Sequence, residues 1–408
     1  MKSILLLGGS RQQVVAIEAA KRLGYRTVLC DYLDDNPGQY VADVFYREST
    51  TDLETMLGIA RRESVSGVLA YASDPAALTA AYISEEMGLP GNPLSSVRIL
   101  STKHLFRSYL REHGFNCPRS APLDSSCGVE ELLLASRDMT LPLVVKPTDS
   151  SGSKGVSVID VRSEEALGRA LEYARSFSRN GIILVEEYIG SAFPRVIGGD
   201  IFVVDGEVAF WGLMSCLRDE SGGGLVPIGE RYPSGMTDRQ ESAVKDELSR
   251  LVDSLGIRFG ELNVEVIIGE GDRPFVLELG ARAGGNMIPI QLSDISGVDL
   301  VEANVRYAMG DQSLDIGFSG CDAAYATYVL HAGERGVFEG VDVSDALSRH
   351  VYRTVMYHEV GDSIEAFDGA NKALGIVFLR FDCIEQMERA LEHIGDDIRV
   401  RVEAGSAR

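Results

Sequence analysis

The first ninety residues alternate short apolar strands with amphipathic helices, and this alternation limits the fold more than any other feature of the chain. Strands that are apolar throughout are buried on both faces, and the helices between them return the chain to the same edge of the sheet. The pattern therefore predicts a parallel, doubly wound sheet. The expected strands cover residues 3–7, 27–30 and 65–70, and the expected helices cover residues 14–23 and 75–87.

A dinucleotide site is the familiar use of such a sheet. Asp31 lies about 20 residues beyond the first glycine turn, where an acidic ribose ligand is expected. However, the turn reads Gly8-Gly9-Ser10 and continues without the GxGxxG pattern. We therefore expect a Rossmann-like domain that does not bind a nicotinamide cofactor.

Length and charge exclude several classes of function. The chain has 408 residues, of which 45% are apolar, so at roughly 100 to 200 residues per domain we expect two to four compact units. It carries 61 acidic against 39 basic residues, a formal net charge of -22. An acidic surface repels phosphate backbones and anionic lipids, so we expect neither a nucleic acid nor a membrane as partner.

The sequence also gives no indication of a targeting segment, a disulfide framework or a zinc site. The N-terminal apolar run is too short for a signal peptide, and no stretch approaches the length of a membrane span. The six cysteines form no CxxC pair, and the six histidines form no HExxH motif. We therefore expect reduced cysteines, no zinc site and a cytoplasmic protein.

Beyond residue 100 the order of elements changes. A strand at 143–147 and a strand at 156–161 enclose a glycine- and serine-rich loop, which predicts a hairpin rather than the strand-loop-helix of a Walker A motif. Further helices are expected at 102–113, 129–137, 164–178, 238–255 and 384–394, and further strands at 182–188, between 200 and 216, and at 323–330 and 373–381.

The strongest chemical signal is a pair of strands, 261–268 and 274–280, each with one glutamate at an equivalent position. If Ile268 faces Phe275 across the turn, the alternation of side chains sets Glu265 opposite Glu278, on the face that also carries Asn263. Opposed carboxylates repel unless a cation lies between them, and hard oxygen ligands select Mg²⁺ or Mn²⁺. The plainer interpretation is two solvated glutamates.

Cationic residues occur near this pair in the chain and in the hairpin. Arg282 follows Glu278 by four residues in a glycine-containing turn and could meet a planar anion through two hydrogen bonds. Lys146 ends an apolar strand, where an unpaired ammonium would be costly. The loop 149–155 supplies backbone N–H, hydroxyl and ammonium donors suited to a triphosphate, although such a loop alone is usually only a turn.

Taken in order and spacing, these features resemble the ATP-grasp superfamily. Within it the chain looks most like the carboxylate-amine ligases of the L-amino-acid ligase type, and its C-terminal lobe is similar to theirs at Gly361-Asp362 and Ala373-Leu374-Gly375. The residues that carry the resemblance are Lys103, Lys146 in Val-Val-Lys-Pro, the loop Asp149 to Gly155, the strand Val185 to Ile189, Glu265 in Asn-Val-Glu, and Glu278-Leu-Gly-Ala-Arg282.

The resemblance implies an α/β protein built on an α+β ATP-grasp fold. Its expected parts are a Rossmann-like first domain (1–100), a small lobe with the phosphate loop (101–190), a large lobe with the metal-binding sheet (191–320) and a C-terminal α+β subdomain, here called the C-terminal lobe (321–408). ATP and Mg²⁺ (or Mn²⁺) are the implied cofactors. The implied partners are small carboxylate and amine substrates, and a homodimer is left open.

The resemblance also implies roles for individual residues. Arg282 and Lys146 are the catalytic candidates, Arg282 steadying the transferred phosphoryl group and Lys146 contacting ATP phosphates. Glu265 and Glu278 are the implied metal ligands. The implied nucleotide contacts are Lys103, the loop residues Ser151, Gly152, Ser153, Lys154 and Gly155, the Glu186 carboxylate on the adenine amino group, the backbone of Glu187 and Ile189 on the ring edge, and Tyr188 packed nearby.

Two positions depart from the family pattern. The asparagine that often follows the second metal-binding glutamate by two residues is Gly280 here, so Asn263 becomes the candidate substitute ligand. The segment 190–194 offers no clear ribose ligand. Candidates for substrate selection are Ser73, Asp74 and Arg218, the last beside the glycine-rich loop 219–224, although residues of this kind are more often solvated loop residues.

Three functions follow as hypotheses. The first is an ATP- and Mg²⁺-dependent ligase that activates a small carboxylate as an acyl phosphate and joins it to an amine, releasing ADP and phosphate. The second is an ATP-dependent carboxylase of the purine-pathway type that uses bicarbonate. The third is a nucleotide-binding protein without turnover, which the intact set of charged residues disfavours.

Overall fold

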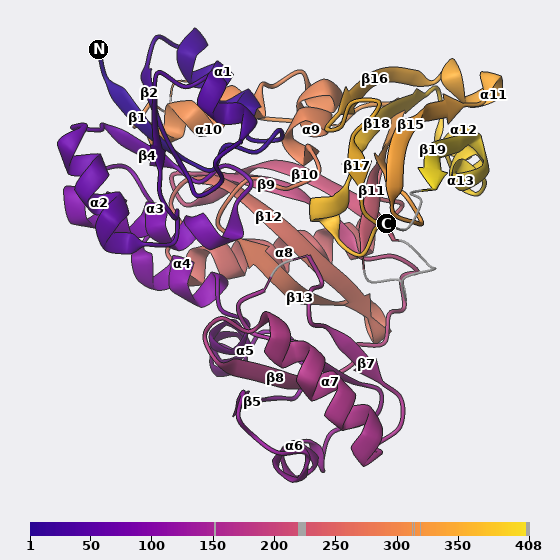
Figure 1. Ribbon diagram of the computed structural model, residues 1–408. Coiled ribbons are helices and arrows are strands. Elements are labelled where there is room, and N and C mark those ends of the chain that lie inside the picture. Colours follow the sequence, from indigo (N-terminus) through magenta and orange to yellow (C-terminus); the bar gives the residue numbers. More distant parts are fainter. Residues whose placement is uncertain (151, 219–225, 312, 314, 319, 405–408) are drawn as a thin grey trace.

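The computed structural model describes the chain except for residues 151, 219–225, 312, 314, 319 and 405–408 (Figure 1). The first domain holds a parallel four-stranded sheet in the order β3-β2-β1-β4. All five residues of β1 are buried, because apolar clusters cover both faces of the sheet. The predicted doubly wound sheet is thus confirmed. Its elements are β1 (Ser3–Leu7), α1 (Val14–Arg22), β2 (Arg26–Asp31), η1 (Pro37–Tyr40), β3 (Val44–Arg47), α2 (Leu53–Arg62), β4 (Gly67–Leu69) and α3 (Asp74–Met87).

The small lobe is an antiparallel sheet in the order β5-β8-β6-β7, with two helices packed against it through one apolar cluster. Strands β6 and β7 pair directly, so the predicted hairpin around the glycine-rich loop is present. Two helices lead into this lobe from the first domain. The elements are α4 (Leu94–Leu100), α5 (Lys103–Glu112), β5 (Ser120–Asp124), α6 (Val129–Ser136), β6 (Leu143–Pro147), β7 (Ser157–Ile159), α7 (Glu164–Phe177) and β8 (Ile182–Glu187).

An eight-stranded sheet connects the remaining parts of the molecule, in the order β13-β12-β9-β10-β11-β14-β18-β16. Helix α8 packs on it through the largest apolar cluster, while α10 packs against both the sheet and α1 of the first domain. The elements up to residue 308 are β9 (Ile197–Val204), β10 (Glu207–Arg218), β11 (Pro227–Tyr232), α8 (Asp238–Ser254), β12 (Gly260–Gly269), η2 (Glu270–Asp272), β13 (Arg273–Gly280), α9 (Ile288–Ser296) and α10 (Leu300–Ala308).

The C-terminal lobe continues this sheet with three of its strands and adds a three-stranded sheet in the order β17-β15-β19. Figure 1 shows this lobe in yellow, across α9 from the first domain. Because the large sheet takes strands from both sides of residue 320, the division of the chain there stays a proposal. The elements are β14 (Ala324–Leu330), β15 (Gly336–Val343), α11 (Asp345–Ser348), β16 (Val351–Met356), β17 (Ser363–Ile364), η3 (Ala370–Lys372), β18 (Gly375–Phe381), α12 (Ile384–Leu391), α13 (Ile394–Asp397) and β19 (Ile398–Ala404).

The register of β12 and β13 differs from the prediction by one residue near the turn. Ile268 pairs with Pro274, whereas Phe275 pairs with Ile267. A shift in register between Glu265 and Val266 then brings Glu265 opposite Glu278, as predicted. A β-bulge of this kind places two residues opposite one and re-aims the side chains beside it. The predicted pairing of Ile268 with Phe275 is therefore wrong, whereas the predicted pairing of Glu265 with Glu278 is confirmed.

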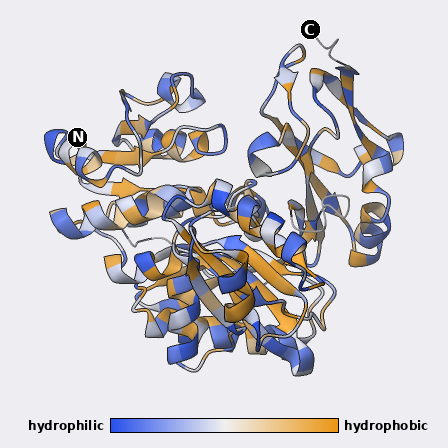
Figure 2. Cartoon of the chain, turned by 60° about the horizontal axis from the view of Figure 1, so that its bottom comes forward, coloured by the Kyte–Doolittle hydropathy of each residue, from blue (hydrophilic) through white to orange (hydrophobic). Residues whose placement is uncertain are grey.

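Hydropathy follows the layers of the fold. In Figure 2 the strands inside the sheets are mainly hydrophobic, and the helices that cover them are mainly hydrophilic on the outside. Among the described residues, no helix combines the length and the apolar character needed to cross a bilayer.

Candidate active site

The opposed glutamates lie at one end of the large sheet and each meets a cation. Glu278 Oε1 lies 2.6 Å from Lys103 Nζ, and Glu265 Oε2 lies 3.4 Å from Arg218 Nη2. Burial raises the pKa of Glu265, and Arg218 offsets part of that rise. Burial acts in the same direction on Glu278, but the Lys103 ammonium outweighs it and lowers the pKa of that carboxyl. Lys103 and Arg218 therefore each compensate one of the two carboxylates in this structure.

The donor set fits Mg²⁺ rather than a transition metal. Within the described residues, no group of three or more His, Cys, Asp or Glu side chains is placed to hold a metal ion. Mg²⁺ is commonly bound by one or two carboxylates and completes its six ligands with water and phosphate oxygens. Asn263, the third predicted ligand, lines the same cavity, but its side-chain Nδ2 donates to Asp200 Oδ1 at 2.8 Å. Its role as a ligand stays a prediction.

Lys146 belongs to a buried ion triad. Its ammonium contacts Glu186 Oε1, and Arg107 Nε donates to Glu186 Oε2 at 2.8 Å. Burial raises the pKa of Glu186, but the two cations more than compensate and lower it to about 2. Both carboxylate oxygens of Glu186 thus already accept hydrogen bonds from cationic side chains. The sequence predicted a contact of this carboxylate with adenine, but not these two cations. Burial lowers the pKa of Lys146, although Glu186 opposes this.

Arg107 was missed by the sequence analysis. It is 1% exposed, and its Nη1 also donates to the carbonyl of Leu277 on β13 at 2.9 Å. The signal was present in the sequence, because residues four apart lie on one helical face and Arg107 follows Lys103 by four. Nothing in the pattern, however, shows that this face of α5 is buried against a glutamate.

A slot of about 200 Å³ lies between the small lobe and the large sheet. Its lining consists of apolar side chains together with the predicted adenine-binding segment, Glu187, Tyr188 and Ile189. Lys103, Lys146, Glu265 and Glu278 add charge to its wall. Apolar walls with a few polar groups are typical of small-ligand sites. The apolar lining residues are Val144, Val156, Val158, Val196, Ile267 and Leu277.

The predicted phosphate loop borders this slot. Gly152 and Ser153 line the slot, and Gly152 and Lys154 line the neighbouring cavity, whereas Ser151 lies outside the described residues. Gly155 has a φ of +76°, and a Cβ there would approach the Pro147 ring to 2.9 Å. Only glycine suits that position, because other residues rarely adopt this conformation. The loop is therefore folded back on the end of β6.

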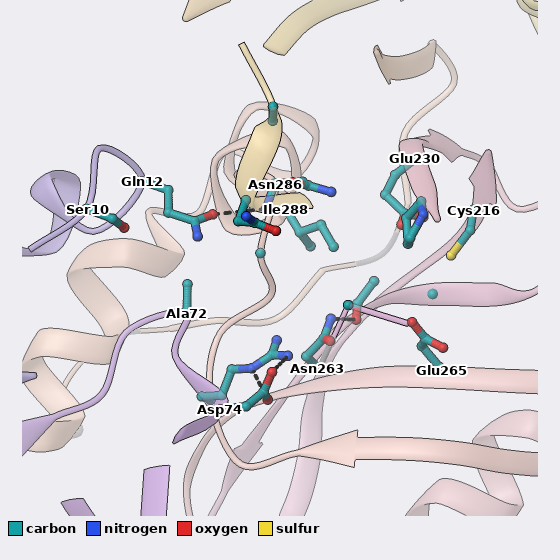
Figure 3. Close-up of a pocket in the computed structure, with 18 of the residues that line it drawn as sticks. Ser10, Gln12, Ala72, Asp74, Cys216, Glu230, Asn263, Glu265, Asn286 and Ile288 are labelled. Carbon is teal, nitrogen blue, oxygen red and sulfur yellow. Dashed lines mark hydrogen bonds and ion pairs between the residues drawn. The ribbon is translucent and has the colours of Figure 1, made fainter. Parts of the chain in front are cut away.

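A central cavity of about 480 Å³ adjoins the slot and is lined by residues of every part of the molecule (Figure 3). Gln12 of the first domain accepts from Asn286 N there at 3.1 Å. Arg282 lines the cavity but is held by Asp74, with Nε and Nη2 donating at 2.6 and 2.8 Å. Burial raises the pKa of Asp74, yet Arg282 outweighs it and lowers the pKa. The two predicted residues are thus brought together.

Of the other two candidates for substrate selection, Arg218 lines the slot and Ser73 is the N-cap residue of a helix. Arg218 lines the slot and is ion-paired with Glu265, while the adjoining loop 219–224 lies outside the described residues. Ser73 precedes α3, and its carbonyl accepts from Ala76 N and Ala77 N. Ser73 therefore starts a helix.

Two further carboxylates in or beside the central cavity were not predicted. Asp200 accepts from Asn263 Nδ2 and, at 2.8 Å, from Gly284 N, so it holds the turn that carries Arg282. Glu230 on β11 is 5% exposed, and its Oε2 has no hydrogen-bond partner in the described part of the chain. Burial raises the pKa of Glu230 to about 8, against a smaller lowering by Cys216.

Comparison with known proteins agrees with this geometry. A family described as the carbamoyl-phosphate synthase L chain, ATP binding domain, matches residues 102–316, more than half of the chain. The carbamoyl phosphate synthase large chain of Pseudomonas aeruginosa is 24% identical over 337 residues, which cover 78% of this chain. The chain spans only about 30% of the length of that relative.

Solved structures share the whole fold. The L-amino acid ligase from Bacillus licheniformis superposes with a TM-score of 0.82 at 18% identity, covering 99% of both chains. The biotin carboxylase domain of the Hydrogenobacter thermophilus 2-oxoglutarate carboxylase gives a TM-score of 0.73 at 18% identity, covering 98% of this chain and 91% of that one, and its structure contains MgADP, ADP and bicarbonate. The predicted ATP-grasp fold is confirmed, and the matching family is an ATP-binding domain. The chain belongs to the family of the carbamoyl-phosphate synthase L chain ATP-binding domain, and hence to the ATP-grasp ligases.

Proposed function

We propose that the protein is an ATP- and Mg²⁺-dependent ligase that activates a small carboxylate, an amino acid or a related metabolite, as an acyl phosphate and couples it to an amine. One observation carries the proposal: Glu265 and Glu278 line both the slot and the central cavity. A phosphoryl group transferred between a nucleotide in the slot and a carboxylate in the central cavity would pass beside them. Mg²⁺ held by these glutamates would neutralise charge on the phosphate oxygens.

The nucleotide is assigned to the slot from its lining. The apolar valines, Ile267 and Leu277 suit the faces of a purine, and the backbone of Glu187 to Ile189 suits its polar edge. Lys103 and Lys146 carry the positive charge for the phosphates. Arg107 and Glu186 hold the Lys146 side chain in one conformation. Its ammonium is therefore already positioned when the phosphates bind.

The central cavity is assigned to the carboxylate. One of its oxygens attacks the γ-phosphorus, an O–P bond forms, and the bond to ADP breaks; the amine nitrogen then attacks the carbonyl carbon and phosphate leaves. Arg282 is the group that steadies the transferred phosphoryl oxygens, for which it must share or exchange its contact with Asp74. The surplus proton of the amine leaves to the phosphate or to water.

Trapping with hydroxylamine tests the proposal. With ATP, Mg²⁺ and a panel of amino acids and related carboxylates, we expect ADP release that depends on one carboxylate, together with its hydroxamate. Bicarbonate-dependent ADP release without a hydroxamate from any member of the panel would favour the carboxylase hypothesis. Binding of ATP without ADP release under any of these conditions would favour a protein without turnover.

A further inference from the structure

A third cavity, here called the outer groove, opens between the first domain and the C-terminal lobe and has a volume of about 890 Å³. One wall comes from α1 and η1, and the other from β16 and the start of α9. In Figure 1, α9 lies between the first domain and β16. The apolar lining residues are Val14, Val15, Pro37, Val41, Met287, Ile290, Val355 and Met356, and all except Met287 are half-buried.

The outer groove adjoins the central cavity. Arg11, Tyr357 and His358 line both, so the two cavities meet at these three side chains. The hydroxyl of Tyr357 lies at this junction, is buried, and has no hydrogen-bond partner within the described residues. A buried hydroxyl without a partner is costly, so a ligand that hydrogen-bonds to it would gain affinity.

Several polar side chains around the outer groove already have partners. Arg353 Nη2 donates to Asp294 at 2.9 Å, His358 Nδ1 lies 3.4 Å from Asp362 Oδ2, and Tyr40 donates to Asp35 at 3.0 Å. Three charged lining residues have no ion pair in the described part of the chain: Arg11 at the junction, Glu18 on α1, and Asp35, which accepts only from the neutral Tyr40 hydroxyl. The junction therefore offers one free guanidinium beside an apolar surface.

From this arrangement we infer that the outer groove binds the amine substrate, which is an apolar amino acid. Its apolar side chain lies along the groove, its carboxylate meets Arg11, and its amino group reaches the central cavity past Tyr357. Covering the half-buried apolar side chains provides the affinity. The inference rests on the proposed ligase activity and adds the site and chemical class of the second substrate.

The test fills the groove and compares nucleophiles of different size. Val14 lines the groove and is half-buried at the start of α1, so Val14→Trp should block the groove with little change to the core. With the carboxylate that gives the most hydroxamate, we expect hydroxylamine and glycine to react as in the unsubstituted protein. The KM for leucine, followed by the mass of the coupled product, should rise about tenfold or more. Val360→Trp, at a 72% exposed valine, is the matched control.

A second variant tests the carboxylate contact separately, and keeps the inference testable if the first variant does not fold. Arg11→Met should raise the KM for leucine but not for leucinamide, which lacks the carboxylate. Equal KM values for leucine in the unsubstituted protein and both variants would overturn the inference. If no carboxylate yields a hydroxamate, the proposed function fails, and the groove is then tested by calorimetric binding of leucine. Binding that Val14→Trp abolishes would still support a leucine site in the groove. No binding of leucine to the unsubstituted protein would reject that site.

Discussion

Glu278 shows how one carboxylate can serve two partners. It lies across from Glu265 and forms an ion pair with Lys103. A cation bound by the two carboxylates would compete with the Lys103 ammonium, which lines the slot where phosphates are expected. The lysine and the metal would thus exchange roles as the nucleotide binds.

Replacing Glu278 tests this directly. Glu278→Gln keeps the shape of the side chain and removes its charge, so we expect a loss of about 100-fold or more in ADP release. The free energy of unfolding should change by less than about 1 kcal/mol, because the residue lines a cavity rather than the core. Glu270→Gln, on the exposed turn between the two strands, is the control. Unchanged ADP release in Glu278→Gln would contradict the metal assignment.

Glu230 predicts a pH dependence of stability. Its pKa is about 8 in the folded protein against an ordinary value of 4.5, because burial disfavours the charged form. The folded state therefore binds more protons than the unfolded state between these values, and stability falls as the pH rises from about 4.5 to 8, at up to about 1.4 kcal/mol per unit.

Urea unfolding measured from pH 5 to 8 should show this fall in the unsubstituted protein and a flatter profile in Glu230→Gln, which cannot ionise. Glu207→Gln, at an exposed position on β10, should keep the slope. Identical slopes in all three proteins would show that Glu230 ionises normally.

At the scale of elements, the Arg107–Glu186–Lys146 triad joins α5, β8 and β6, and the contact to Leu277 adds β13. It therefore links the small lobe to the edge of the large sheet, on either side of the slot. The sequence predicted each of these elements but not the triad, because the pairing of a buried arginine with a buried glutamate depends on how α5 packs.

Arg107→Met should destabilise the protein by roughly 2 to 3 kcal/mol, since a buried oxygen of Glu186 and the Leu277 carbonyl each lose a charged donor. The double variant Arg107→Met/Glu186→Gln should recover none of that loss, because it leaves the buried Lys146 ammonium without a counter-ion. Arg111→Met, on the exposed side of the same helix, should change stability by less than about 0.5 kcal/mol. Urea unfolding of the four proteins measures this, and equal stability of Arg107→Met and Arg111→Met would contradict the role of the triad.

The β12–β13 pair shows what strand periodicity can and cannot predict. Alternation placed Glu265 and Glu278 on one face, as observed, but the bulge beside Glu265 could not be foreseen and the assumed turn was shifted by one residue. Strand β11 was not predicted, and with it Glu230 was missed. The order of apolar and polar residues predicts elements well, whereas bulges, and a short strand such as β11 between β10 and β14, depend on the neighbours with which they pair.

At the scale of the whole molecule, the net charge of -22 and an anionic nucleotide are compatible. Lys103, Lys146 and Lys154 line the slot and the central cavity, while the acidic excess is spread over the rest of the chain. The sequence predicted these residues from their order, but the cavities themselves form only when the first domain, both lobes and the C-terminal lobe assemble. The contact of Asp74 with Arg282, which are 208 residues apart, could be found only in the folded chain.

Transfer of oxygen from the carboxylate to phosphate tests the central claim most directly. An acyl phosphate forms through an oxygen of the substrate carboxylate, and that oxygen leaves with the phosphate when the amine attacks. With ¹⁸O-labelled carboxylates of the amino-acid panel, Mg·ATP and an amine, mass spectrometry of the released phosphate should find one ¹⁸O atom per phosphate. Phosphate without label from any of these carboxylates, or label that comes only from ¹⁸O-bicarbonate, would contradict a carboxylate-amine ligase.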